Sequence, residues 1–157
     1  MPRYFDLDEA TSLLPRLSKL MAEVISLHIT LQKQSQRLDL LDIELSWDLL
    51  RGDFDVEGDE IDPHDRAAIA RVRLTYELLH ERIEAVEALG VEVREVIEGR
   101  VDFRTWLDGE TEAALSWQLG EPSIRWFHDV DHEDVRHSVF GHNFSRCRNV
   151  LGAAQRQ

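Results

Sequence analysis

The 157-residue sequence contains 31 acidic and 18 basic residues, a formal net charge of −13, and 43% of its residues are hydrophobic. A chain of this length and apolar content has enough material for a folded core, which excludes a disordered protein. Nucleic acid is not expected as a partner, because binding to phosphate backbones requires clustered lysines and arginines.

Neither a targeting segment nor a membrane anchor is expected. The N-terminus MPRYFDLDEA has acidic residues where a signal peptide needs an apolar region, and no uninterrupted run of about 18 apolar residues follows. We therefore expect a cytoplasmic protein without a membrane partner. Cys147 is the single cysteine, so we expect an inert thiol and no intrachain disulfide.

The first third of the chain predicts a long helix. Asp6 and Glu9 have the spacing of a capping box, in which the side chain of each residue bonds the amide of the other. Pro15 then predicts either a short helix that ends near Leu14 or a kink. Beyond it a heptad-like series with one polar position follows: Leu17, Leu20, Val24, Leu27, Leu31, Gln34, Leu38, Leu41 and Leu45.

A second run has the same spacing and predicts a partner helix. Its start is marked by a capping residue and a first-turn proline, Asp62 and Pro63, and its end by Gly90. Because both runs present one apolar stripe, we expect a long antiparallel, coiled-coil-like hairpin over residues 6–90. The apolar positions of this run are Ile69, Val72, Tyr76, Leu79, Ile83 and Val86.

An acidic loop is predicted between Asp48 and Pro63. Asp53, Asp55, Glu57 and Gly58 imitate the opening of an EF-hand loop, in which alternate carboxylates converge on calcium. His64 stands where that loop needs its bidentate glutamate. The pattern therefore favours a solvated acidic loop over a calcium site.

After Gly90 the apolar period changes from 3.6 to two, which predicts strands. Turn signals at Glu98-Gly99, Asp108-Gly109 and Gly120-Glu121-Pro122 divide residues 91–128 into a four-stranded antiparallel meander. The expected fold class is α+β, a helical hairpin followed by this small sheet. We expect a single domain over residues 1–136 and a C-terminal tail over residues 137–157.

Four segments of the chain resemble a known family of prokaryotic proteins, domain of unknown function 2203. They are YFDLDEATSLLPRL at residues 4–17, LGVEV at 89–93, GRVDF at 99–103 and WQLGEPSIRWFHDVD at 117–131. The resemblance spans about residues 4–131, and the last segment is its most specific part. It implies a helical hairpin with a small sheet and brings no established activity, cofactor or substrate.

The histidines near the end of the predicted sheet are the candidate metal ligands. Glu121 and His128 cannot share an ion, because a strand rising about 3.3 Å per residue separates them by roughly 20 Å. Glu121 is then a turn residue, and the ring of His128 donates to a carbonyl. The better candidates for a divalent transition metal are His128, Asp131 and His132, which a turn or helical continuation would place on one side.

Tryptophans suggest that both faces of the last predicted hairpin carry large apolar groups. Trp117 and Trp126 fall on neighbouring strands, and Trp47 and Trp106 lie elsewhere in the chain. The helices can cover one face of the sheet, so the other face needs the tail or a second subunit.

No sequence motif of a catalytic site is present: GxSxG, a Walker loop and HExxH are all missing from the sequence. The leading hypothesis is a non-catalytic scaffold or protein-interaction protein that forms a homodimer and binds a protein partner. The alternative is a metal-binding regulator or metal-dependent enzyme that uses His128, Asp131 and His132, with Glu110 or Glu112 as a further ligand. His137 and His142 lie downstream of this group.

Overall fold

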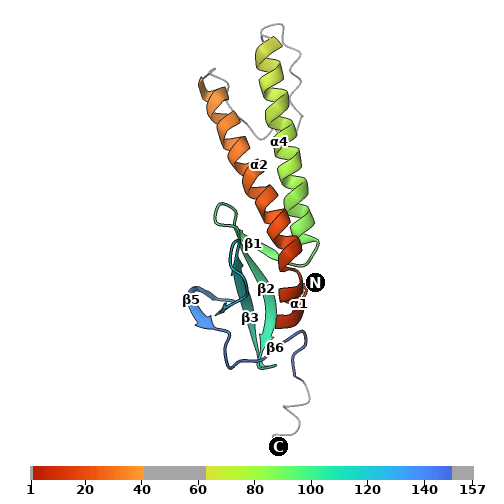
Figure 1. Cartoon of the computed structure of the whole chain (residues 1–157), viewed down its shortest axis with the longest axis vertical. Helices are drawn as coiled ribbons and strands as arrows, with labels where there is room; N and C mark the ends of the chain where they lie inside the picture. Colours follow the sequence, from red (N-terminus) through yellow and green to blue (C-terminus); the bar gives the residue numbers. More distant parts are fainter. Residues whose placement is uncertain (1, 41–62, 150–157) are drawn as a thin grey trace, which may run out of the picture. The chain divides into compact units, whose positions relative to one another are not determined.

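The computed structural model describes residues 2–40 and 63–149, and the chain divides into two compact units. The hairpin unit is Glu23–Glu84, and the sheet unit is Met1–Ala22 together with Ala85–Gln157. The elements are α1 (Leu7–Ser12), α2 (Leu14–Leu40), α4 (Pro63–Glu87), β1 (Glu92–Glu95), β2 (Arg100–Leu107), β3 (Thr111–Gln118), β4 (Trp126–Asp129), β5 (His132–Ser138) and β6 (Phe144–Ser145), as Figure 1 shows. Within the described ranges, no helix has the length and apolar character needed to cross a membrane.

The chain enters α1 through the predicted N-cap. Asp6 has extended backbone, and its Oδ1 accepts a hydrogen bond of 2.7 Å from the amide of Glu9. The second half of the capping box does not form, because Glu9 Oε1 lies 2.9 Å from Arg146 and pairs with it instead. α1 ends before Pro15, which lies in the first turn of α2, where the amide proton that it lacks is not needed. The short-helix alternative is therefore the one that the structure adopts.

The two helices of the hairpin unit run antiparallel. Leu38, near the end of α2, packs in a buried cluster with Ile69 and Val72, near the start of α4. Farther along, Arg82 of α4 donates from Nε to Glu23 of α2 across 2.8 Å. These contacts support the predicted helical hairpin, while coiled-coil packing stays a prediction.

The predicted apolar stripe of the first helix is correct in outline, but only part of it is completely buried. Leu17, Val24 and Leu38 are completely buried, and Met21 is buried in place of the predicted Leu20. The half-buried members of the predicted stripe are Leu20, Leu27 and Leu31. The change from Leu20 to Met21 follows from the helix geometry. A straight helix has 3.6 residues per turn, so positions spaced by a strict 3-4 alternation, 3.5 on average, gradually rotate away from one face.

Several predictions fall on residues outside the described ranges. They concern Leu41, Leu45, Trp47, the cap at Asp62 and the acidic loop with Asp53, Asp55, Glu57 and Gly58. At the borders of the second helix, α4 is described from Pro63 onward, and Gly90 follows it with a positive φ of 86°. The predicted left-handed glycine after the second helix is confirmed, whereas Pro63 is the first described residue of its range, so its place at the helix start stays a prediction.

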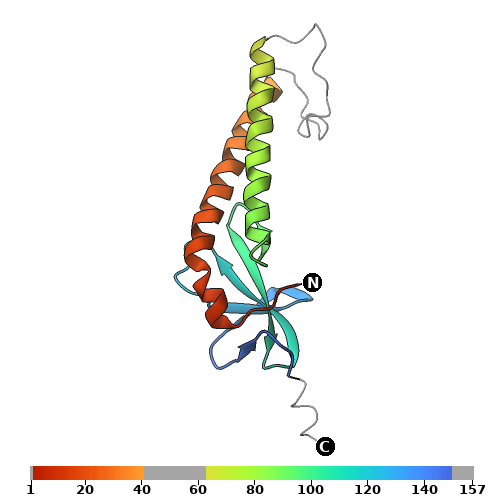
Figure 2. The same ribbon diagram turned by 90° about the vertical axis from the view of Figure 1, so that its right-hand side faces the viewer.

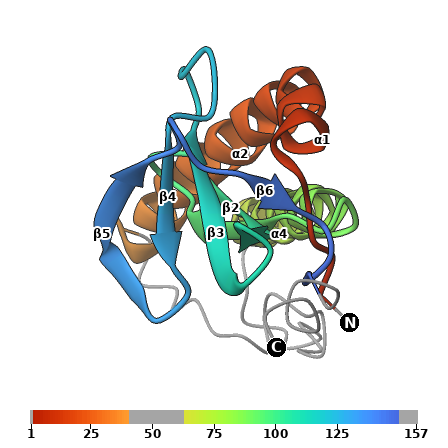
Figure 3. The same ribbon diagram turned by 90° about the horizontal axis from the view of Figure 1, so that it is seen from below.

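The sheet has six described strands and not the predicted four. β1 to β4 form the expected meander, and β5 extends it beyond β4, so the strand order is β1-β2-β3-β4-β5. β6 lies outside this order and pairs with β2 (Figure 3). All strand pairs are antiparallel. β5 and β6 come from a segment with little apolar alternation, which is why the period of two did not reveal them.

Three segments in turn occupy the outer edge of β2. β1 pairs with its first residues, the amide of Phe5 donates to the carbonyl of Arg104 at 2.8 Å, and β6 pairs with Trp106 and Leu107. An exposed strand edge is a template for aggregation, so this succession protects β2 along its length.

The turn between β2 and β3 is the hairpin that the sequence predicts. Asp108 and Gly109 both have positive φ, 53° and 74°, and the amide of Glu110 donates to Leu107 at 3.0 Å. Positive φ at both central residues is the requirement of a type I′ turn. A Cβ added at Gly109 would lie 2.7 Å from Asn149, so this position needs glycine for space as well as for conformation.

One face of the sheet forms the core of the sheet unit. The register aligns Phe103, Leu115 and Phe127 on this face, and all three are buried. Phe5 packs edge-on against Phe103, with ring centroids 5.3 Å apart. In Figure 2 the segment that leads into α1 lies along the sheet. Further buried residues of this unit are Ala10, Leu14, Leu17, Met21, Val91, Val101, Trp117 and Phe144.

The tryptophans of the last hairpin lie on opposite faces, in agreement with the prediction that both faces carry large apolar groups. Trp117 is aligned with Val101 and is 1% exposed, and its indole N–H donates to the carbonyl of Glu121 at 2.9 Å. Trp126 is aligned with Ser116 on the other face and is 37% exposed.

Candidate functional site

The face of the sheet opposite the core is polar and holds the candidate functional site. Because side chains alternate along a strand, the register places Arg100, Asp102 and Arg104 of β2 on this face together with Ser116 of β3 and His128 of β4. We call it the polar face.

Asp102 and His128 form a buried pair at the centre of the polar face. Asp102 is 3% exposed and His128 is 5% exposed. Oδ2 of Asp102 lies 2.8 Å from Nε2 of His128. The two residues stand on β2 and β4, and the residues of β3 between them on this face are the small Ala114 and Ser116. The small side chains leave space for the two longer ones to meet above β3.

The hydrogen bonds of His128 define its protonation state. Nδ1 lies 2.9 Å from the carbonyl of Asp129, which can only accept, so Nδ1 carries a proton. Nε2 faces the carboxylate of Asp102, which also accepts. Hydrogen bonding to Asp102 raises the pKa of His128 above its ordinary value, against the desolvation that lowers it. The arrangement favours the protonated ring, in which both nitrogens donate.

This geometry does not form a nucleophilic triad, although Ser116, His128 and Asp102 meet in one cavity. In a triad one imidazole nitrogen bonds the aspartate and the other takes the proton of the serine. Here the nitrogen of His128 that does not bond Asp102 donates to the carbonyl of Asp129. No imidazole nitrogen remains to activate Ser116.

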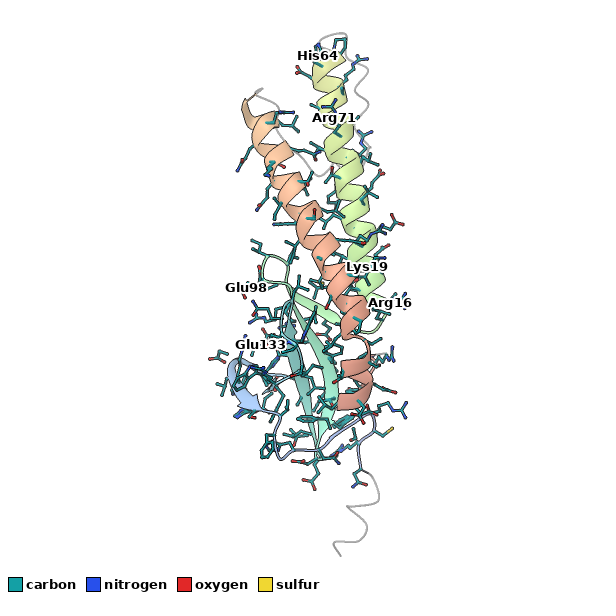
Figure 4. The ribbon with its side chains drawn as sticks, in the orientation of Figure 1. Arg16, Lys19, His64, Arg71, Glu98 and Glu133 are labelled. Carbon is teal, nitrogen blue, oxygen red and sulfur yellow. The ribbon has the colours of Figure 1, made fainter. Side chains whose placement is uncertain are left out.

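Arg94 and Glu133 come together over the buried pair. Arg94 is the extra residue of a β-bulge in β1, because the register shifts between Val93 and Glu95. Its Nε lies 3.5 Å from Asp102 Oδ2, and its Nη2 contacts Glu133 of β5, which is labelled in Figure 4. The bulge thus directs a guanidinium onto the carboxylate of Asp102.

A small cavity beside the pair has a volume of about 10 Å³, the space of roughly one water oxygen. Oδ1 of Asp102 is buried and has no hydrogen-bond partner within the described ranges. Arg100 and Arg136 also line the cavity and have no ion-pair partner in the described part of the chain. We call this the Asp102 cavity; its lining residues are Arg94, Arg100, Asp102, Ser116, His128, Glu133 and Arg136.

The Asp102 cavity is locally cationic although the chain is acidic. Three arginines outnumber the carboxylates of Asp102 and Glu133 among its lining residues, and His128 adds a further positive charge when it is protonated. The screening length at physiological salt is about 8 Å, so acidic groups elsewhere on the surface contribute little to the potential here.

A second charged network continues across the polar face. Arg104 donates from Nε to Glu92 at 2.7 Å and from Nη1 to Glu112 at 3.1 Å, and the hydroxyl of Tyr4 donates to Glu112 at 2.8 Å. The bond to Glu112 raises the pKa of Tyr4, and the bond to Glu92 raises that of Arg104. The ring of Tyr4 also stacks on Trp106 at 5.3 Å.

A larger open pocket of about 530 Å³ lies beside this network, which is the size of an ordinary small-molecule site. Arg94 borders both this pocket and the Asp102 cavity. The other cationic residues that line the larger pocket already have partners: Arg104 belongs to the network above, and Arg3 donates to the carbonyl of Leu89 at 2.8 Å. The unpaired guanidinium groups are therefore at the smaller cavity.

The predicted metal ligands occupy different environments. His128 is buried and both its ring nitrogens are hydrogen-bonded, whereas Asp131 and His132 are exposed at the turn between β4 and β5. Within residues 2–40 and 63–149, no group of three or more His, Cys, Asp or Glu residues is placed to hold a metal ion. The metal site stays a prediction, and metal analysis of protein purified without a histidine tag tests it.

The remaining candidate residues have identifiable local contacts. Glu112 belongs to the network around Arg104, and the ring of His137 lies 5.3 Å from that of Phe127. Glu121 is the predicted turn residue, since its Oε1 accepts from the amide of Gln118 at 2.8 Å. His142 Nδ1 lies 3.5 Å from Asp108, and Cys147 is exposed and free.

Sequence reasoning did not find Asp102, Arg94 or Arg100 as site residues. Asp102 and His128 are 26 positions apart, and only the register of three strands brings them together. A usable signal was present in GRVDF, where Arg100 and Asp102 alternate with the apolar Val101 and Phe103. In a strand this alternation places both charged side chains on the face opposite the apolar ones.

The comparisons with known proteins define the family. Residues 3–133 match the model of the uncharacterized conserved proteins DUF2203, so the chain belongs to this family. The match includes Arg94, Arg100, Asp102 and His128 and ends at Glu133, before Arg136. No curated protein and no solved structure matches the chain.

Proposed function

We propose that this protein is a non-catalytic binding protein whose polar face takes a small oxyanion. The observation that carries the proposal is a cavity lined by His128, Arg100 and Arg136, whose two guanidinium groups have no ion-pair partner among the described residues. Guanidinium groups bind carboxylate and phosphate through parallel, charge-assisted hydrogen bonds.

The chemistry of the buried pair favours binding over catalysis. Both nitrogens of His128 are hydrogen-bonded to protein oxygens, so the ring has no free position for proton transfer. What the pair supplies is a fixed positive charge beneath the cavity, next to Arg94.

Titration calorimetry of the full chain with inorganic phosphate tests the proposal. Charge-assisted hydrogen bonds are worth about 1.5 to 3 kcal/mol, so Arg100→Gln and Arg136→Gln should each weaken binding by about tenfold or more. Arg125→Gln is the matched control, because Arg125 is exposed and does not line the cavity. The absence of saturable binding, or an equal loss in the control variant, would contradict an oxyanion site.

The second candidate function is interaction with a protein partner, with a second copy of the chain as the first partner to test. It is favoured by the side chain of Phe140, which follows β5 and is 90% exposed. Trp126 and Val135 of the neighbouring strands are also exposed, at 37% and 46%, and exposed apolar patches rimmed by polar residues mark interaction sites. A two-fold dimer would bury the same surface on both copies.

Light scattering at micromolar concentration tests this second candidate. Phe140→Ser should shift the mass toward that of the 18.2 kDa chain. Ile97→Ser is the control, since Ile97 is also exposed, at 62%, but lies in the turn between β1 and β2. A monomeric parent protein would refute the homodimer. The cytoplasm remains the expected compartment, which cell fractionation would check.

A further inference from the structure

Arg94 is the cationic residue that borders both cavities of the polar face. Its side chain is 29% exposed, and it lines the Asp102 cavity as well as the open pocket of about 530 Å³. Each of its three guanidinium nitrogens faces a carboxylate: Nε lies 3.5 Å from Asp102, Nη1 lies 3.7 Å from Glu92, and Nη2 contacts Glu133. An oxyanion therefore binds Arg94 only in place of one of these carboxylates.

Two of the three carboxylates are held by other residues. Asp102 is 3% exposed and lies 2.8 Å from Nε2 of His128. Glu92 accepts from Nε of Arg104 at 2.7 Å, which is a closer contact than the one it makes with Arg94. Moving either side chain would break a short, charge-assisted hydrogen bond to another residue, so neither of them gives way to a ligand.

Glu133 is the carboxylate that a ligand can displace. Its side chain is 48% exposed, and Arg94 is its only ion-pair partner within the described ranges. It lies on β5, all of whose residues are exposed (Figure 4). The register between β4 and β5 shifts here, so that residues 133–136 have no paired residue on β4. Glu133 thus approaches Arg94 from a segment that strand pairing with β4 does not fix.

From this arrangement we propose that Arg94 is the third guanidinium of the oxyanion site and that Glu133 is an internal competitor, which holds Arg94 until the ligand displaces it. The inference rests on the oxyanion-binding function and adds its regulation. The carboxylate of Glu133 and a ligand oxyanion offer the same kind of acceptor oxygen to a guanidinium group, so they compete for the same donors. Once Glu133 is displaced, the ligand has three arginines as donors, because Arg94 lines the same cavity as Arg100 and Arg136.

Titration calorimetry of the full chain with inorganic phosphate tests the proposal through the sign of one effect. Glu133→Gln removes the charge of the competitor and should tighten phosphate binding by about tenfold, the value of one charge-assisted hydrogen bond. Asp134→Asn is the matched control, because it removes the same charge from the next residue of β5, which is exposed and does not line the cavity. The control should change the affinity by less than about twofold, since solvent and salt screen an exposed charge.

A double-mutant cycle then assigns the gain to Arg94. Arg94→Gln should weaken phosphate binding by about tenfold, and Glu133→Gln should no longer tighten it when Arg94 is also replaced. A thermal melt of each variant establishes that it is folded. If Arg94→Gln does not fold, the comparison of Glu133→Gln with Asp134→Asn decides alone.

The outcomes separate this inference from the function on which it rests. Unchanged or weaker phosphate binding by Glu133→Gln, or an equal gain in Asp134→Asn, refutes the competition and leaves the oxyanion site in place. A gain that persists when Arg94 is replaced refutes the role of Arg94. Saturable binding by neither the parent protein nor Glu133→Gln refutes the oxyanion function and the competition together.

Discussion

Removing the imidazole of His128 should destabilise the sheet unit strongly. His128→Ala leaves the carboxylate of Asp102 buried without its main cationic partner, and such one-sided loss of a buried ion pair costs about 3 to 5 kcal/mol. Arg94 Nε remains 3.5 Å from Asp102, so we expect the lower end, about 3 kcal/mol. For a chain of this size that corresponds to a decrease in Tm of roughly 6 to 12 °C.

Tryptophan fluorescence during thermal or urea unfolding measures this effect, because Trp106, Trp117 and Trp126 all belong to the sheet unit. His80→Ala is the control. His80 also faces a carboxylate, at 3.1 Å, but its side chain is 63% exposed, so its loss should cost at most about 0.5 kcal/mol. A destabilisation by His128→Ala no larger than that of the control would refute the reading of a buried ion pair.

The same variant has a defined pH dependence. Hydrogen bonding to Asp102 raises the pKa of His128, so its stabilisation is fully present below the unfolded pKa of 6.5 and is lost as pH rises through the higher folded pKa. The other charged groups around the ring are Arg94, Arg100, Arg136 and Glu133. The stability difference between the parent protein and His128→Ala should therefore be larger at pH 6 than at alkaline pH. A difference that grows with pH would contradict the imidazolium assignment.

Three further substitutions test the fold. Gly109→Ala should destabilise the protein by more than about 1 kcal/mol, because it combines a positive φ with a steric clash; Gly120→Ala, which has a positive φ and open space, should cost less in the same urea unfolding assay. Asp6→Ala should cost about 0.5 to 2 kcal/mol through loss of the N-cap, measured by calorimetry. Leu38→Ala should cost about 2 to 5 kcal/mol in denaturant unfolding monitored by far-UV circular dichroism, whereas Leu74→Ala, at 58% exposure, should stay within about 0.5 kcal/mol. Similar costs within either matched pair, or an unaltered melt for Asp6→Ala, would contradict these expectations.

Local backbone chemistry made much of the fold predictable. The cap at Asp6, the left-handed Gly90 after α4 and the hairpin at Asp108-Gly109 each depend on a few neighbouring residues, so the sequence contains the whole cause. The four strands of the meander followed from a period of two and from turn residues.

β5 and β6 escaped prediction because their causes are not local. Every residue of β5 is exposed, so its sequence has no buried alternate positions to produce an apolar pattern. β6 has only two residues, and pairing with Trp106 and Leu107 of β2 defines it. Strands held mainly by pairing to a neighbour leave little trace in their own residues.

The candidate site shows the same division between local and distant causes. His128, Asp131 and His132 were grouped because they are close in the sequence, yet the turn after β4 separates one buried side chain from two exposed ones. The actual partner of His128 is Asp102, which the register places on the same face two strands away.

The middle strand explains why this pairing occurs at this point of the sheet. Directly paired residues on adjacent strands are close enough to touch, but residues on β2 and β4 are separated by the width of β3, about 10 Å. A bulky residue on β3 would keep them apart, whereas Ala114 and Ser116 let the side chains of Asp102 and His128 reach across. Ser116 also lines the Asp102 cavity, and its small side chain does not fill it. The buried ion pair and the small cavity beside it thus both depend on small side chains on the central strand of the polar face.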